Sequence, residues 1–232
     1  MQTDPDRSQT ASASSSAASL LQKDVQLIQI VDNSLADATR RAGLHLACRP
    51  GCTQCCHGAF AINPLDALRL RAAMADLALT QPEQAAAIAE RAQQYLIEFG
   101  PSFPGDPTTG ILGASPEAET AFEDFANDAP CPALNPTTGL CDLYDARPMT
   151  CRVFGPPVRS NSAADDEEGF AVCELCFTEA SPEEIAAAEM IVPHAEEECL
   201  LDELNQQQSA GDTIVAFCLV SKYPLGRGST AS

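Results

Sequence analysis

The chain has 232 residues, enough for one large domain or two small ones around a real hydrophobic core. Thirty-three acidic and 13 basic residues give a formal net charge of -20, which repels phosphate backbones and anionic lipid headgroups. We therefore expect no nucleic acid and no membrane as partner. Eleven cysteines are far more than packing requires, and they are the feature to explain.

The two ends of the chain are polar. Residues 1–18 are rich in Ser and Ala, so we predict a disordered tail there, and a second one over residues 226–232. Asp4 and Asp6 stand where an export signal carries positive charge, and no apolar stretch follows them. We expect a cytoplasmic protein, in which clustered cysteines indicate metal binding or redox chemistry rather than a disulfide framework.

The spacing of apolar residues and the capping signals predict a mainly helical chain. Apolar residues recur every three or four positions over residues 20–47, as in an amphipathic helix that leads to Cys48. Capping residues followed by proline begin most of the other expected helices. These helices are predicted near residues 65–78, 81–98, 116–127, 182–191 and 194–207.

Two stretches are predicted to be irregular. Glycine and proline alternate over residues 100–113, which indicates a surface loop, and residues 135–139 have the composition of a hairpin turn. The predicted fold is mainly α with a small irregular β-hairpin region that is rich in cysteine, in a single compact metal-tied domain. We assign residues 20–180 to a cysteine-cluster metal-binding domain and residues 181–222 to C-terminal helices that pack on it.

Nine of the eleven cysteines lie beside turns, in three blocks. Thiolates are the preferred ligands of Zn2+ and of iron-sulfur clusters, and turns let such ligands converge from several directions. Nine thiols would suffice for two four-ligand sites. The blocks are Cys48, Cys52, Cys55 and Cys56; Cys131, Cys141 and Cys151; and Cys173 and Cys176.

The adjacent pair Cys55 and Cys56 constrains how these thiols can share a metal. Neighbouring side chains on a helix diverge by about 100°, so we expect either two metals or one ligand and one spectator. Whether His57, next to the pair, is a ligand is left open. The alternative is that the cysteines are small buried hydrophobic residues, which suits Cys218, and we leave Cys218 and Cys199 out of the site.

The spaced cysteine blocks resemble a known family. The strings are Cys48-x3-Cys52-x2-Cys55-Cys56, Cys131-Pro-Ala-Leu, Gly-Leu-Cys141-Asp-Leu-Tyr and Arg147-Pro-x2-Cys151-Arg152-x-Phe. Over about residues 44–180 they resemble the CxxCxxCC cysteine-cluster family, the YkgJ-type zinc- or iron-chelating domain. The resemblance implies that the seven cysteines of these strings chelate the metal, with Cys173 and Cys176 added at the distal end. A flagellin lysine methylase bears a similar cluster, which favours an iron-sulfur centre.

Arg147 and Arg152 are notable in a chain with few basic residues. Four thiolates around Zn2+ leave a charge of about -2, and guanidinium groups that donate to sulfur or to nearby carboxylates can offset it. We therefore predict that both arginines support the metal or cofactor site. The alternative is an ion pair with Asp142 or Asp145. The acidic runs at residues 165–168 and 196–198 are expected to be solvated surface.

Three functional hypotheses follow from these residues. The first is a metal-binding protein whose thiolates hold an iron-sulfur cluster or Zn2+, with the metal or cluster as its partner. The second is an iron-sulfur enzyme in redox or methyl-transfer chemistry, although no cofactor fingerprint or substrate site is visible in the sequence. The third is a thiol-disulfide redox protein that uses Cys173 and Cys176 as its dithiol.

Overall fold

The computed structural model describes residues 6–159, 170–207, 210–220 and 223–224, the side chains of residues 6–18 and 207 excepted. Over these residues the chain is mainly helical with two short antiparallel strand pairs, which confirms the predicted fold class. Strands β1 (Gly105–Asp106) and β2 (Ile111–Leu112) form one pair, and β3 (Val158–Arg159) and β4 (Phe170–Ala171) form the other. No helix in this part of the chain is both long enough and apolar enough to cross a membrane.

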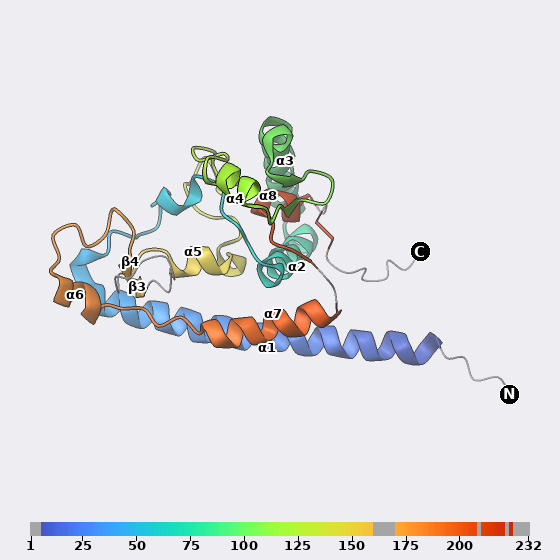
Figure 1. Cartoon of the computed structure of the whole chain (residues 1–232), viewed down its shortest axis with the longest axis horizontal. Helices are drawn as coiled ribbons and strands as arrows, with labels where there is room; N and C mark the ends of the chain where they lie inside the picture. The colour runs from blue at the N-terminus through green and yellow to red at the C-terminus, as the bar shows by residue number, and fades with distance from the viewer. Residues whose placement is uncertain (1–5, 160–169, 208–209, 221–222, 225–232) are drawn as a thin grey trace.

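The helices follow the predicted order (Figure 1). They are α1 Asp6–Ala42, α2 Pro64–Thr80, α3 Pro82–Phe99, α4 Pro116–Glu123, α5 Met149–Val153, α6 Pro182–Ala187, α7 His194–Gln207 and α8 Val215–Leu219. Short 3-10 helices lie at Gly43–His45, Gln54–Cys56, Gly100–Ser102 and Tyr144–Ala146, labelled η1 to η4.

Side-chain caps fix several helix starts, as the sequence predicts. The Asn63 side chain accepts the backbone N–H of Asp66 at 3.0 Å, and Ser181 forms a reciprocal capping box with Glu184. Helix α6 ends at residue 187, earlier than the predicted 191, because the N–H of Met190 donates to the Pro157 carbonyl at 2.7 Å. That bond holds the chain after α6 against the strand pair β3–β4 instead of continuing the helix.

Helix α1 is a long rod along one side of the molecule, and α7 lies beside it (Figure 1). Its buried face includes Leu27 and Val31, which share a hydrophobic cluster with Leu200 and Leu204 of α7. The helix begins at Asp6, so the backbone of residues 6–18 is helical where a disordered tail is predicted. This segment is rich in Ser as well as Ala, and the cost of starting a helix is already met by the packed part of α1, which accounts for the difference. Residues 1–5 and the predicted tail 226–232 lie outside the described residues.

Helices α2, α3 and α8 form the main core. The apolar run at residues 214–220 gives α8, which packs against both other helices, with Phe217 and Cys218 each 1% exposed. The N–H of Ile62 donates to the carbonyl of Thr213 at 2.8 Å, and this bond draws the C-terminal run back to the start of α2. The boundary at residue 180 between the cysteine-cluster domain and the C-terminal helices that pack on it stays a prediction.

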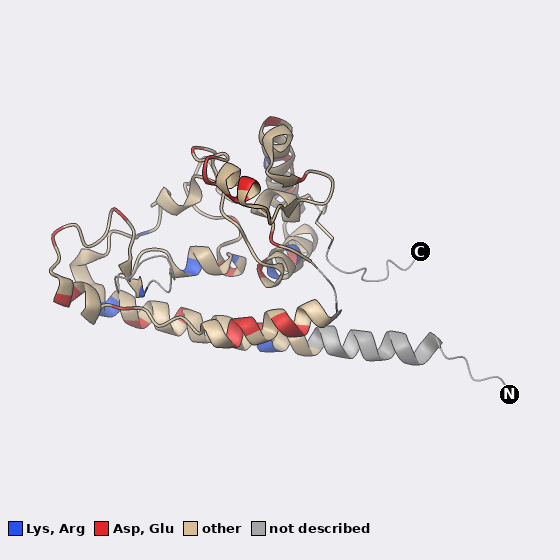
Figure 2. Ribbon diagram, viewed as in Figure 1, with Lys and Arg blue, Asp and Glu red and all other residues tan. Residues whose placement is uncertain are grey.

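The predicted hairpin is present, but as a single β-bridge and its turn rather than a pair of strands. Leu134 and Cys141 form an antiparallel bridge, and the Asn135 side chain accepts the N–H of Thr137 at 3.0 Å to fix the turn between them. In Figure 2 acidic residues are spread over α4, α6 and α7. The acidic run at residues 165–168 lies outside the described residues.

Candidate metal centre

All eleven cysteines are free thiols, and nine of them lie on short segments between the end of α1 and the turn after β4. Cys48 and Cys52 follow η1, and Cys55 and Cys56 lie on η2. The remaining five lie on the chain that leads into the hairpin (Cys131), on the hairpin (Cys141), on α5 (Cys151) and after β4 (Cys173 and Cys176). None of these segments could bring the thiols together alone, so their arrangement is a product of the tertiary fold.

Five cysteines gather where η2 meets the hairpin and α5. The N–H of Cys131 donates to the Cys56 carbonyl at 2.7 Å, which joins η2 to the chain before the hairpin. Burial first, and then the charges of Cys131, Cys55 and Cys141, raise the pKa of the Cys151 thiol. Because their charges act on one another, we treat these thiols as one group. We name Cys55, Cys56, Cys131, Cys141 and Cys151 the large thiol group.

Within the large thiol group, the adjacent residues Cys55 and Cys56 shift each other's pKa. A hydrogen bond from the Cys56 thiol lowers the pKa of Cys55 to about 6, with burial opposing it and the Arg147 charge assisting. The same bond, followed by burial and by the charges of Cys55, Cys131 and Cys141, raises the pKa of Cys56. Both adjacent cysteines therefore face the same neighbours, and the group holds one thiol more than a tetrahedral shell needs.

The other four cysteines gather at the far end of α1. The Cys176 sulfur accepts the backbone N–H of Ala47 at 3.3 Å, and burial, together with the thiols of Cys176 and Cys52, raises the pKa of both Cys48 and Cys173. Cys48 is exposed overall, but partial burial of its thiol, followed by the charges of Cys176, Cys52 and Cys173, raises the pKa of Cys48 to about 12. We name Cys48, Cys52, Cys173 and Cys176 the small thiol group.

Gly155 lies next to Cys48 of the small thiol group, and no motif in the sequence singles it out. Its φ of +119° is strained for any residue with a side chain, and a Cβ there would lie 2.9 Å from the Cys48 sulfur. We expect Gly155→Ala to lower the free energy of unfolding by about 3 kcal/mol, because backbone strain and a clash add. Urea unfolding of the full chain measures this loss.

Gly51 supplies the matched control for Gly155. It also has a positive φ, +89°, but a Cβ there would meet nothing within 4 Å. We expect Gly51→Ala to carry the backbone strain alone, at about 1 to 2 kcal/mol. Equal losses in the two variants would show that contact with Cys48 contributes nothing.

Within each group, as the structure describes it, the thiols are neighbours, but they do not surround a common point at which a metal ion could sit. Among the described residues, no three His, Cys, Asp or Glu side chains stand in positions that would hold a metal ion as they are. The donor chemistry itself fits zinc or an iron-sulfur centre, since both prefer thiolates. Metal binding at either group would require the cysteine side chains to rotate. Which of the cysteines are ligands stays a prediction.

Arg152 and Arg147 take different positions beside the large thiol group. The Arg152 guanidinium is 1% exposed and donates to the Asp32 carboxylate on α1 at 2.6 Å and to the backbone carbonyls of Arg147 and Asp145. It therefore ties α5 to α1. The Arg147 guanidinium lies 4.0 Å from the centre of the Tyr144 ring, and its charge lowers the pKa of Cys55.

The carboxylate of Asp142 pairs with a different arginine from those considered in the sequence. Its side chain is 7% exposed and accepts Arg91 of α3 at 2.6 Å, together with the amides of Gln84 at 2.9 Å and Asn135 at 3.2 Å. This network anchors the hairpin that carries Cys141 to α3. Arg91 lay within a predicted helix and no signal in the sequence pointed to its role.

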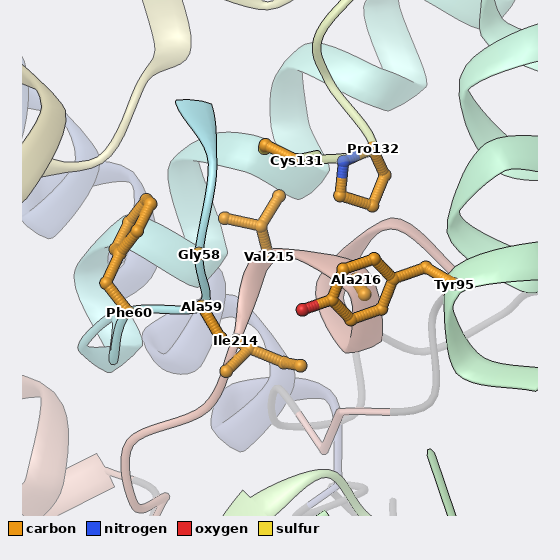
Figure 3. A pocket seen from close by; sticks show the side chains of 9 residues that line it. All are labelled: Gly58, Ala59, Phe60, Tyr95, Cys131, Pro132, Ile214, Val215 and Ala216. Carbon is orange, nitrogen blue, oxygen red and sulfur yellow. The ribbon is translucent and has the colours of Figure 1, made fainter. Parts of the chain in front are cut away.

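Two hollows lie beside the large thiol group. The smaller, about 20 Å3, is lined by Cys131, Tyr95 and apolar residues, and in Figure 3 the Tyr95 hydroxyl points into it. It has room for about one water molecule. The larger, about 670 Å3, lies between α1, α2 and residues 141–146, and Cys141 forms part of its wall.

The remaining candidates lie apart from these hollows. His57 is exposed, and its Nδ1 lies 3.0 Å from the Thr53 carbonyl oxygen, so the question of its ligation stays open. Cys199 is exposed on α7, and Cys218 is buried in the main core. The structure gives neither of these two cysteines a place in the large or the small thiol group.

Comparison with known proteins gave one match. A family model described as "CxxCxxCC: Putative zinc- or iron-chelating domain" matches residues 47–176, a range that includes all nine clustered cysteines. No curated protein and no solved structure matches the chain.

Proposed function

The chain belongs to the CxxCxxCC family of zinc- or iron-chelating domains, and on that premise we propose that it binds zinc or an iron-sulfur cluster through its clustered cysteine thiolates. One observation carries the proposal. Nine thiols from segments far apart in the sequence are neighbours in two groups, which ordinary packing of small apolar side chains does not require.

The surroundings of the large thiol group suit an anionic metal-thiolate centre. Arg147 places positive charge near Cys55 and Cys141, where burial otherwise raises the pKa of Cys141. That charge favours the thiolate form, which is the form that binds metal. Each thiol must lose its proton to bind a metal, and the positive charge of the metal ion would stabilise the thiolates that result.

Anaerobic purification followed by elemental analysis, sulfide assay and a visible spectrum tests the proposal and identifies the metal. Stoichiometric zinc in a colourless protein supports a zinc site, and iron with labile sulfide in a brown protein supports a cluster. Cys199→Ser should retain the metal in full, because Cys199 is exposed on α7 away from both groups. A folded protein that contains neither metal would overturn the proposal.

The larger hollow favours a second candidate, an iron-sulfur enzyme in redox or methyl-transfer chemistry. It opens beside Cys141 and is lined by acidic residues such as Asp76 and by apolar residues such as Ile28 and Leu77. A hollow of about 670 Å3 is within the usual range for small-molecule sites. Reversible loss of the visible absorbance on reduction would support this candidate, and a colourless zinc protein would exclude it.

The structure disfavours the dithiol hypothesis. A redox dithiol needs one exposed thiol with a lowered pKa. Cys173 and Cys176 are 6% and 3% exposed, and burial raises the pKa of Cys173. We therefore do not propose thiol-disulfide exchange.

A further inference from the structure

The small thiol group has the composition of a complete zinc site. Its four thiols match the number of ligands in a closed tetrahedral site, and its C-x3-C and C-x2-C spacings fall in the range of structural zinc proteins. The two pairs come from only two segments, one after α1 and one after β4. Each pair lies in a tight local turn, because the N–H of Cys52 donates to the Arg49 carbonyl at 2.9 Å and that of Cys176 to the Cys173 carbonyl at 2.8 Å.

A backbone hydrogen bond joins the two segments of this group at the cysteines themselves. The Cys176 sulfur accepts the N–H of Ala47, the residue before Cys48, at 3.3 Å. Backbone N–H donors to sulfur are typical of the hydrogen bonds that stabilise metal-bound thiolates. Cys52 lies at the same junction, because the side chain of Gln54, two residues further on, donates at 2.5 Å to the side chain of Glu174, which lies between Cys173 and Cys176.

The two thiol groups belong to different hydrophobic clusters. Cys173 and Cys176 pack with Ala42, Phe177 and Ala188 at the end of α1. Cys131 and Cys141 instead pack against the core that α2, α3 and α8 form.

Hydrogen bonds and a ring contact join the two segments of the small group. The N–H of Phe177 donates to the His45 carbonyl at 2.8 Å, and the rings of the two residues stack with their centres 5.5 Å apart. An exposed hydrogen bond of 2.5 Å joins Gln54 to Glu174 across 120 residues of sequence. A metal that bridges these segments would close a long loop, where such a link restrains the unfolded chain most.

We propose that Cys48, Cys52, Cys173 and Cys176 bind a metal ion of their own, so that the loaded chain carries two separate metal centres. The small group forms a closed structural centre that fastens the segment after β4 to the end of α1. The large group forms the other centre, beside the hollow at Cys141. This inference rests on the proposed function, because it divides the same cysteines between two centres.

Zinc stoichiometry of the full chain, reconstituted anaerobically with Zn2+, tests the division. We expect two zinc ions in the wild type, one in Cys173→Ser/Cys176→Ser, one in Cys131→Ser/Cys141→Ser and none when all four are replaced. Cys199→Ser serves as the control and should retain both ions. One ion in the wild type that is lost with either pair would overturn the two-centre proposal while leaving metal binding intact. No ion in the wild type would overturn both.

A measurement on the wild type covers the case in which a cysteine variant fails to fold. The zinc-loaded protein is treated with increasing chelator, the exposed thiols are alkylated, and mass spectrometry identifies the modified cysteines. We expect the four thiols of the small group to become reactive together and at a different chelator concentration from the large group. Simultaneous exposure of all nine thiols would contradict two centres.

Discussion

Removal of the bound metal is expected to lower the free energy of unfolding by several kcal/mol. In small zinc domains the bound metal supplies on the order of 10 kcal/mol. The expected effect is large because the thiol groups join segments that are far apart in the sequence, so a metal would close long loops. At the small group the segment after β4 meets the end of α1, where the N–H of Phe177 donates to the His45 carbonyl at 2.8 Å, and at the large group η2 meets the hairpin. Urea unfolding of the loaded and the chelator-treated protein, with thiols kept reduced, measures the difference.

Hydrogen exchange locates the same effect within the chain. The core of α2, α3 and α8 contains Ile88, Phe217 and other buried apolar side chains that do not depend on metal, so their protection should fall least. Residues 46–56 and 170–177 should lose protection first. An unchanged urea midpoint after complete demetallation would show that the thiols contribute to stability by packing alone.

Replacement of Arg152 by methionine is expected to cost about 2 to 6 kcal/mol of stability, which is about 1 to 3 kcal/mol for each of two backbone carbonyls that lose their donor. The guanidinium is 1% exposed and satisfies the Asp32 carboxylate and two backbone carbonyls, those of Arg147 and Asp145. Methionine fills similar volume but leaves both carbonyls without their donor. Because Cys151 is the neighbouring residue on α5, we also expect the variant to bind metal less tightly at the large thiol group.

Arg40→Met is the matched control for Arg152. Arg40 also lies on a helix, α1, and pairs with Asp37 at 2.7 Å, but its side chain is 76% exposed. Such surface pairs contribute little, so we expect a change below about 0.5 kcal/mol. If the Arg152 variant lost no more stability than this control in urea unfolding, the assigned role of Arg152 as a tie between α5 and α1 would be wrong.

Sequence predicts the elements whose signals are local. The Asn63 and Ser181 caps act within one helical turn, and α7 begins and ends at the predicted residues 194 and 207. The hairpin follows from Asn135, whose side chain makes the turn with its own neighbours in the sequence. Each of these interactions spans only a few residues, so the pattern contains the information that fixes it.

The short helices and the partition of the cysteines depend instead on distant contacts. Helices α5 and α8 have five residues each, and such helices are stable only where the rest of the fold packs around them. The partner of Arg152, Asp32, lies 120 residues away. Spacing alone placed Cys48 and Cys52 in one block with Cys55 and Cys56, whereas the fold pairs the first two with Cys173 and Cys176.

X-ray absorption at the metal edge of the anaerobically purified protein tests the central claim most directly, since it reports the atoms bound to the metal. Thiolate ligation predicts a shell of sulfur scatterers at about 2.3 Å. A shell of nitrogen or oxygen atoms without sulfur would contradict the assignment of the clustered cysteines as the ligands.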